Sequence, residues 1–276
     1  MKFITLNNGI NMPMLGFGVY GLEEGAQCVN TVRFAIETGY RSIDTASGYD
    51  NEKSVGQAIR ESGVARDDIF LTTKLGNGAQ REGTVQAAFD ESLAKLGLDY
   101  IDLYIIHWPC PGHFEAAWLA LEKIQASGKV RAVGVSNFQA HHIETIKKTW
   151  AFAPALNQIE LHPLLTQKPL INFCRENGIA PQAWSPLGGN RPLQERIFTS
   201  PAVSRLAEKY SKSPAQIVLR WNIECGVVTI PKSANEDRIT QNFNIFDFAL
   251  TPQEMTEIDA LNENLRGGPD PDNFNF

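Results

Sequence analysis

The chain has little of what marks disulfide-rich or metal-binding proteins. Its 276 residues contain only four cysteines, Cys28, Cys110, Cys174 and Cys225. They lie far apart, with no Cys-x-x-Cys pair and no regular spacing to a histidine. Such spacing indicates neither a disulfide framework nor a zinc site, so we expect free thiols that are buried or half-buried.

Positive charge is also scarce, since 25 Lys and Arg stand against 31 Asp and Glu, a net charge of −6. The five histidines are scattered, and no basic stripe is present. We therefore expect neither nucleic acid nor an anionic membrane as a partner. The first residues turn polar too early for a secretory segment, and no apolar run is long enough to span a bilayer, which predicts a cytoplasmic protein.

Linkers and low-complexity segments are missing as well, so we expect one domain over residues 1–276. Short β-branched or apolar runs alternate with segments that have apolar residues at helical spacing. The eight runs are 14–18, 42–45, 69–75, 100–107, 131–136, 156–161, 181–185 and 227–231. Strict alternation of strand and helix requires parallel pairing, which predicts an α/β fold, a closed (β/α)8 TIM barrel.

Two segments lie outside the alternation. Residues 3–6 and 11–12 flank Asn-Asn-Gly, a turn signal, and predict an N-terminal β-hairpin on the barrel floor. Thr251, followed by Pro252 and then Glu254, has the pattern of a capped helix start. We therefore expect an extra C-terminal helix that ends near Asn262.

The segment 16–21 supports an alternative fold, because its pattern Gly-x-Gly-x-x-Gly precedes Asp44 at the spacing of a Rossmann fingerprint. Two observations argue against it. Glu23 and Glu24 stand where the helix N-terminus of a Rossmann fold holds a pyrophosphate, which they would repel. The alternation also continues evenly to residue 231, so the barrel is the favoured interpretation.

Polar side chains stand where the predicted strands end, and a barrel of this type places its chemistry at that edge. The second strand ends at Asp44, with Tyr49 just beyond it, the third ends at Lys74 and the fourth at His107. A phenol with a pKa near ~10 is a weak acid until a cation lowers that value. Lys74 supplies such a cation, Asp44 holds the ammonium, and Tyr49 is then able to protonate an alkoxide while His107 orients a carbonyl. Each residue also has a structural interpretation, as a turn cap, loop tyrosine, ion pair or core histidine, and their joint placement favours catalysis.

The chain resembles the aldo-keto reductases over nearly its whole length. The motifs that carry the resemblance are 39–52, 103–109, 134–138, 157–163 and 230–233. The tail motif Gly-Pro-Asp-Pro at 268–271 is similar to that of bacterial members related to 2,5-diketo-D-gluconate reductase. The resemblance implies NADPH-dependent reduction of aldehydes and ketones by direct hydride transfer, with Tyr49 as general acid assisted by Asp44, Lys74 and His107.

The same resemblance implies a set of cofactor contacts. Ser136, Asn137 and Gln158 are expected to contact the carboxamide of the nicotinamide. Trp184 is expected to stack on the nicotinamide ring. Ser185 and Leu187 are assigned to the pyrophosphate and Asn242 to the adenine, although Gln241 replaces the glutamate that is usual in the family.

Charge placement indicates which nicotinamide is preferred. Lys232 and Ser233 precede a predicted helix that opens at Asn235, with Arg238 in its first turn. A guanidinium and an ammonium directed at one place fit the 2′-phosphate of NADPH better than a free ribose hydroxyl. The alternative is a solvated basic helix face.

Tyr20 and Trp108 are the predicted walls of the substrate pocket. Residues 76–78, Gly-Asn-Gly, stand where many relatives carry a Trp, which predicts a wide mouth that admits sugar-derived ketones, α-keto esters and small aldehydes. No metal is expected, because Glu160 and His162 lack a third ligand. Outside the site, His113, His141 and His142 are interpreted as loop or surface residues, and Trp118 and Trp221 as packing against the barrel.

Two other functional classes remain open at this point. A Schiff-base aldolase could use Lys74 as its nucleophile, but this leaves Lys232, Ser233 and Arg238 without a role. An NADPH-binding regulatory protein with little turnover is the second alternative, against which the complete set of four catalytic residue types argues. We expect a monomer.

Overall fold

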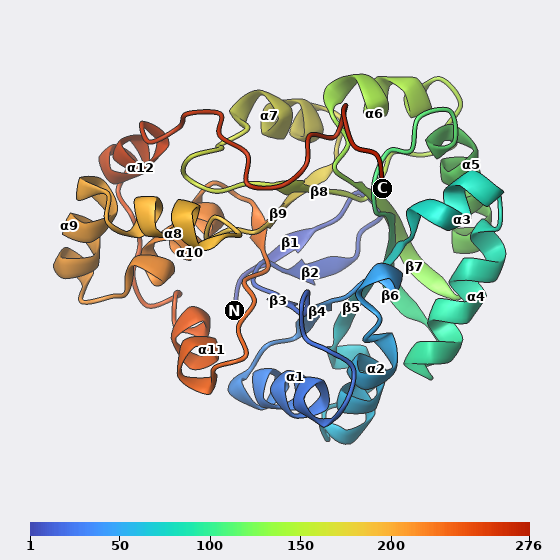
Figure 1. Ribbon diagram of the computed structural model, residues 1–276, viewed down its shortest axis with the longest axis horizontal. Helices are drawn as coiled ribbons and strands as arrows, with labels where there is room; N and C mark the ends of the chain where they lie inside the picture. Colours follow the sequence, from blue (N-terminus) through green and yellow to red (C-terminus); the bar gives the residue numbers. More distant parts are fainter.

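The computed structural model describes all residues 1–276, and its eight parallel strands are drawn in Figure 1. They are β3 (Phe17–Gly18), β4 (Ser42–Asp44), β5 (Phe70–Leu75), β6 (Ile101–Ile106), β7 (Val130–Ser136), β8 (Leu156–Glu160), β9 (Ala180–Trp184) and β10 (Val228–Thr229). Each strand pairs with the next one along the chain, and a parallel bridge from Leu15 to Thr229 joins the two ends of the sheet. The order never reverses as it does in a Rossmann sheet, so the predicted (β/α)8 barrel is confirmed and the alternative is wrong.

The strands are uniformly apolar because both of their faces are covered. Every residue of β5 and β6 is buried, as expected for parallel strands that face the barrel interior on one side and helices on the other. The predicted hairpin is also present, as β1 (Phe3–Thr5) paired with β2 (Asn11–Pro13). Leu6 and Met12 beside it pack against Leu103, Ile105 and other interior residues, so the hairpin closes the barrel floor as predicted.

Twelve helices surround the strands in Figure 1. Their bounds are α1 (Ala26–Thr38), α2 (Glu52–Glu61), α3 (Asn77–Glu82), α4 (Val85–Leu96), α5 (Phe114–Ala126), α6 (Ala140–Lys147), α7 (Lys168–Glu176), α8 (Arg191–Phe198), α9 (Pro201–Tyr210), α10 (Pro214–Glu224), α11 (Glu236–Phe243) and α12 (Pro252–Asp259). Trp118 in α5 and Trp221 in α10 are buried in the core, as expected. None of the helices combines the length and the apolar character that crossing a bilayer requires.

The helix starts follow their predicted caps. Thr251 and Glu254 form a reciprocal capping box at the start of α12, and the Asn235 side chain accepts the Arg238 backbone N–H at the start of α11. Helix α12 ends at Asp259, three residues before the predicted end at Asn262. The four cysteines are free thiols, of which only Cys225 is partly exposed, in agreement with the expectation.

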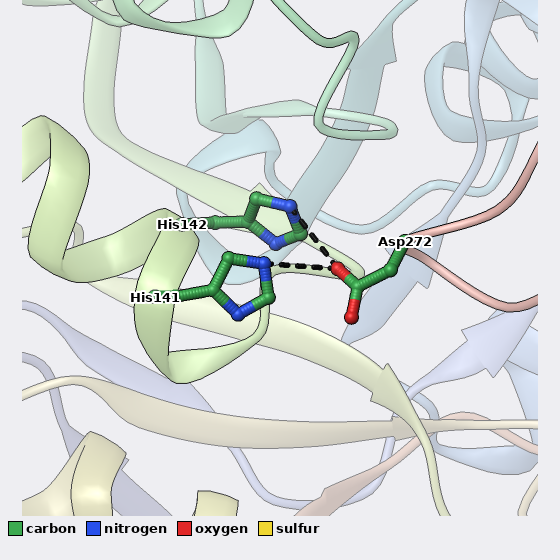
Figure 2. Close-up of side chains that lie close together, drawn as sticks. All are labelled: His141, His142 and Asp272. Carbon is green, nitrogen blue, oxygen red and sulfur yellow. Dashed lines mark ion pairs between the residues drawn. The ribbon is translucent and has the colours of Figure 1, made fainter.

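The C-terminal segment leaves α12 and crosses the barrel toward α6 and α3 (Figure 1). Figure 2 shows Asp272 of this segment facing two adjacent histidine rings of α6, with its Oδ1 atom 2.9 Å from His141 Nε2 and 3.4 Å from His142 Nε2. His142 Nδ1 accepts the backbone N–H of Gln139, so the His142 proton lies on Nε2 and is donated to Asp272. His142 is buried and caps α6, which corrects its interpretation as a loop or surface residue.

Candidate active site

A buried lysine lies at the centre of the predicted site. Lys74 in β5 is fully buried, and its Nζ atom donates to Asp44 Oδ1 at 2.5 Å, to the Thr45 carbonyl at 2.8 Å and to Tyr49 Oη at 3.3 Å. An ammonium has three N–H donors, and these contacts use all three. Burial alone would lower the pKa of Lys74, but Asp44 and Tyr49 raise it above its ordinary value, so the lysine is a cation.

Tyr49 reaches the lysine from the short 3-10 helix Ser47–Tyr49 that follows β4. Its pKa is raised, because burial disfavours the phenolate more strongly than the Lys74 charge favours it. The sequence argument considered only the effect of the lysine, and the structure shows that desolvation outweighs it. The phenol therefore keeps its proton at neutral pH and faces the cavity as a donor.

His107 follows β6 and lies edge-on to Tyr49, with 5.6 Å between the ring centroids. Burial, with a smaller contribution from the Lys74 charge, lowers the pKa of His107 to about 3. The imidazole is therefore neutral over the physiological range, and it carries one N–H to offer to an acceptor in the cavity.

Gln158 in β8 binds the oxygen of the Asp44 carboxylate that Lys74 does not bind. Its Nε2 atom donates to Asp44 Oδ2 at 2.7 Å and to Gln182 Oε1 at 2.7 Å. Because a carboxylate only accepts, this contact fixes which end of the Gln158 amide faces Asp44. The Oε1 atom of Gln158 is the end left for a ligand.

Trp184 at the end of β9 is fixed at the N–H edge and at the benzene edge of its indole ring. Its indole N–H donates to Asn137 Oδ1 at 2.8 Å, and Asn137 Nδ2 in turn donates to the His107 carbonyl at 3.0 Å and to Ser136 Oγ at 3.1 Å. Gly268 packs so tightly on the indole ring that a Cβ at this position would overlap it. The Asn137 amide is thus used within the protein, and any ligand contact has to share it.

These residues line one cavity of about 1970 Å³ at the carboxyl ends of the strands. That volume exceeds the roughly 300–1,000 Å³ of most small-molecule sites, so a dinucleotide and a substrate fit together. Lys74 lies beneath the cavity floor and does not line it. The lining includes the other predicted residues Tyr20, Asp44, Tyr49, His107, Trp108, Ser136, Asn137, Gln158, Trp184, Ser185, Leu187, Lys232, Ser233, Arg238 and Asn242.

One end of the cavity lies at the start of α11. Lys232 and Arg238 are exposed there, while Ser233 is buried, with its Oγ atom accepting the Asn235 backbone N–H at 3.1 Å. The first turn of α11 also carries Glu236 and Asp237. Binding of an anion at this place therefore depends on the two cationic side chains. The acidic side chains of the first turn offset the positive end of the helix dipole.

At the other end of the cavity the tail forms a wall that the sequence did not predict. Phe274 and Phe276 pack on Trp108 with ring centroids 5.1 and 5.2 Å away, and Phe276 lines the cavity. Asn77 and Arg81 of α3 donate to the main-chain oxygen of Phe276 at 3.1 and 2.5 Å. The tail thus places an aromatic side chain beside residues 76–78, and the wide mouth remains a prediction.

Glu160 and His162 hold the same tail and form a pair of their own. Both are buried, with 3.2 Å between His162 Nε2 and Glu160 Oε1. Glu160 also accepts the backbone N–H groups of Gly267 and Gly268, at 2.6 and 3.2 Å. The carboxylate therefore anchors the tail next to Trp184.

Comparison with known proteins gives a consistent result. Residues 14–263 match the aldo/keto reductase family. The chain is 51% identical over 276 residues to the oxidoreductase YtbE of Bacillus subtilis, covering 99% of this chain and 97% of the relative. It is 49% identical over 273 residues to the glyoxal reductase of the same organism, with the same coverage of 99% and 97%.

A solved structure agrees with these relatives. The Bombyx mori aldo-keto reductase in complex with NADP superposes with a TM-score of 0.90 at 39% identity, over 98% of this chain and 96% of that one. The chain therefore belongs to the aldo-keto reductase family and is a nicotinamide-dependent oxidoreductase.

Proposed function

We propose that this protein reduces aldehydes and ketones to alcohols with NADPH. The observation that carries the proposal is the contact between the buried Lys74 ammonium and the Tyr49 phenol at the floor of a large cavity. NADPH, when bound, supplies a hydride to the carbonyl carbon. The large core cluster of 58 buried residues, which extends from Met14 to Ile258, supports one reductase domain.

The protein residues in this proposal handle the proton. As hydride reaches the carbonyl carbon, negative charge develops on the oxygen, and Tyr49 donates its proton there. Lys74 stabilises the phenolate that remains, and Asp44, held by Lys74 and Gln158, keeps the ammonium in place. The neutral His107 donates a hydrogen bond that orients the carbonyl. The proton donor in this scheme, Tyr49, is thus a group that is protonated at neutral pH.

The cofactor assignment rests on two parts of the cavity, the Trp184 and Gln158 side chains and the start of α11. Trp184 offers a flat face for the nicotinamide, and the free Oε1 atom of Gln158 suits the N–H₂ of its carboxamide. Lys232 and Arg238 suit a 2′-phosphate, which favours NADPH over NADH. The NADP complex of the Bombyx mori relative supports this choice. Asn137, Ser136, Ser185, Leu187, Ser233 and Asn242 complete the proposed cofactor contacts.

The test is the consumption of NADPH, and separately of NADH, by wild type and Tyr49→Phe with a panel of aldehydes and ketones. The panel includes glyoxal because of the glyoxal reductase relative. Turnover by wild type and its loss in Tyr49→Phe support the reductase. NADPH binding without turnover of any carbonyl supports the regulatory alternative, and a borohydride-trapped adduct on Lys74 supports the aldolase.

A further inference from the structure

A second glutamine lies behind the one that lines the cavity. Gln182 in β9 is fully buried, and it is not among the residues of the cavity lining. It pairs with Gln158 in the register of β8 and β9, so the two side chains lie on the same face of the sheet. Gln182 therefore has no direct access to a ligand and can act on one only through its neighbour.

The Gln158 amide is held by two acceptors from different parts of the barrel. It donates one N–H to Asp44 Oδ2 and the other to Gln182 Oε1, each at 2.7 Å. Asp44 lies on β4, which is not adjacent to β8, whereas Gln182 lies on the strand next to β8. A side-chain amide has only two N–H donors, so these contacts use the whole Nε2 end of Gln158.

The second acceptor fixes the direction of the Gln158 oxygen. A contact with Asp44 alone would leave the amide free to turn about a single hydrogen bond. With Gln182 Oε1 as a second partner, both N–H directions are set, and the planar amide has one orientation. The Oε1 atom of Gln158 is then held at the cavity, ready to accept a hydrogen bond.

The other end of Gln182 is unfavourable for stability. Because its Oε1 atom accepts from Gln158, its Nε2 atom is the opposite end, and this atom is buried without a hydrogen-bond partner. A buried N–H that lacks an acceptor destabilises the folded protein, and an apolar side chain of similar volume would avoid that cost. Departures of this kind are expected at functional sites, which indicates that the oxygen end has a function.

We propose that Gln182 is a positioning residue for the nicotinamide. By fixing the amide of Gln158, it directs the Gln158 Oε1 atom to the N–H₂ of the cofactor carboxamide. This inference rests on the proposed function, since it requires the nicotinamide cofactor assigned there. Gln182 touches neither cofactor nor substrate in this scheme.

The experiment compares two cofactors that differ only where Gln158 would bind. In the 3-acetylpyridine analogue of NADP⁺ a methyl group replaces the carboxamide N–H₂, so the donor is lost. The readout is the ratio of the dissociation constant of the analogue to that of NADP⁺, measured by calorimetric titration. We expect a ratio of about 10 for wild type and a fall of about threefold or more in Gln182→Met, whose sulfur is only a weak acceptor.

The matched control is Asn222→Leu. Asn222 in α10 is also a fully buried amide with one unpaired atom, and it does not line the cavity. Its ratio should equal that of wild type. Thermal unfolding shows that each variant is folded, and Gln182→Leu replaces Gln182→Met if the latter is not.

Three results overturn the proposal. The first is a wild-type ratio near 1, because Gln158 then makes no contact with the carboxamide. The second is a fall in the Gln182 variant of less than about threefold, the change expected for one hydrogen bond. The third is an equal fall in Asn222→Leu, because the loss of any buried amide would then explain the change.

The measurement separates this inference from the reductase proposal, because the ligands are bound and not turned over. If wild type binds NADP⁺ but reduces no carbonyl, the reductase proposal fails, while the expected fall in the ratio still supports the role of Gln182. If wild type binds neither NADP⁺ nor NADPH, both proposals fail.

Discussion

The Lys74 ammonium lies 3.3 Å from the Tyr49 phenol oxygen, and Tyr49 lines the cavity while Lys74 is buried behind it. Replacing the phenol by phenyl keeps the packing and removes the proton. We expect Tyr49→Phe to lower kcat for carbonyl reduction by about two to four orders of magnitude. The NADPH dissociation constant, measured by fluorescence titration, should stay close to wild type. Retention of a tenth or more of kcat would contradict the acid role.

The protonation states predict a level pH profile for reduction. The pKa of Lys74 and that of Tyr49 are both raised, so both groups stay protonated at neutral and moderately alkaline pH. The pKa of His107 is lowered to about 3, so it is already neutral in mildly acidic solution. We expect kcat/KM to be constant from about pH 5 to about pH 10, the ordinary pKa of a phenol, and to fall only above that range, where Tyr49 loses its proton. A midpoint between about pH 6 and pH 7 that disappears in His107→Gln would show that the histidine titrates during catalysis.

The cations near α11 predict which nicotinamide is bound. Arg238→Ala removes a charge-assisted hydrogen bond to a 2′-phosphate, so the dissociation constant for NADPH should rise about tenfold or more. NADH lacks this phosphate, and its dissociation constant is the internal control. Equal changes for the two cofactors would mean that Arg238 does not distinguish them.

The contact between α2 and α4 predicts a stability change. Gly56 packs so closely on the Leu96 carbonyl that an added Cβ would overlap backbone atoms. We expect Gly56→Ala to lower the free energy of unfolding by about 2 kcal/mol or more, seen as a lower Tm. Gly78→Ala is the matched control, because its Cβ meets nothing within 4 Å and the site lies in α3. In that variant helix propensity should leave Tm unchanged or raise it.

The pairing of Asp272 with the two histidines of α6 predicts local mobility. The Asp272 side chain is 51% exposed, so its loss should cost less than about 1 kcal/mol and leave Tm almost unchanged. In Asp272→Ala we expect faster amide hydrogen exchange across residues 270–274, detected by mass spectrometry, with unchanged exchange in the barrel strands. Unchanged exchange in the tail would show that the stacked aromatic rings hold it without the carboxylate.

Most of the barrel could be predicted from the sequence because parallel strands buried on both faces are short continuous apolar runs. The same runs located Asp44, Lys74 and His107, since each run stops at a polar residue. A local helical turn places Tyr49, and its position near Lys74 follows from strand adjacency.

The parts that sequence patterns missed depend on contacts between distant segments. Residues 260–276 have no helical or strand period, so nothing in them indicated that Phe276 would lie on Trp108 or that Arg81 would bind the Phe276 main-chain oxygen. The Gln182 contact with Gln158 was missed for another reason, because a glutamine within an apolar strand carries no signal of its partner. The raised pKa of Tyr49 likewise follows from burial, which only the three-dimensional structure provides.

The hairpin that fills the barrel floor determines where ligands can enter and leave the barrel. With Leu6 and Met12 packed among the interior side chains, the barrel has no rear exit. Any ligand of the cavity therefore has to enter and leave on the side where Trp108, Trp184 and Phe276 line it. A bulky product therefore blocks entry of the next ligand until it has left. Product release can then be slower than the chemical steps and limit the turnover rate.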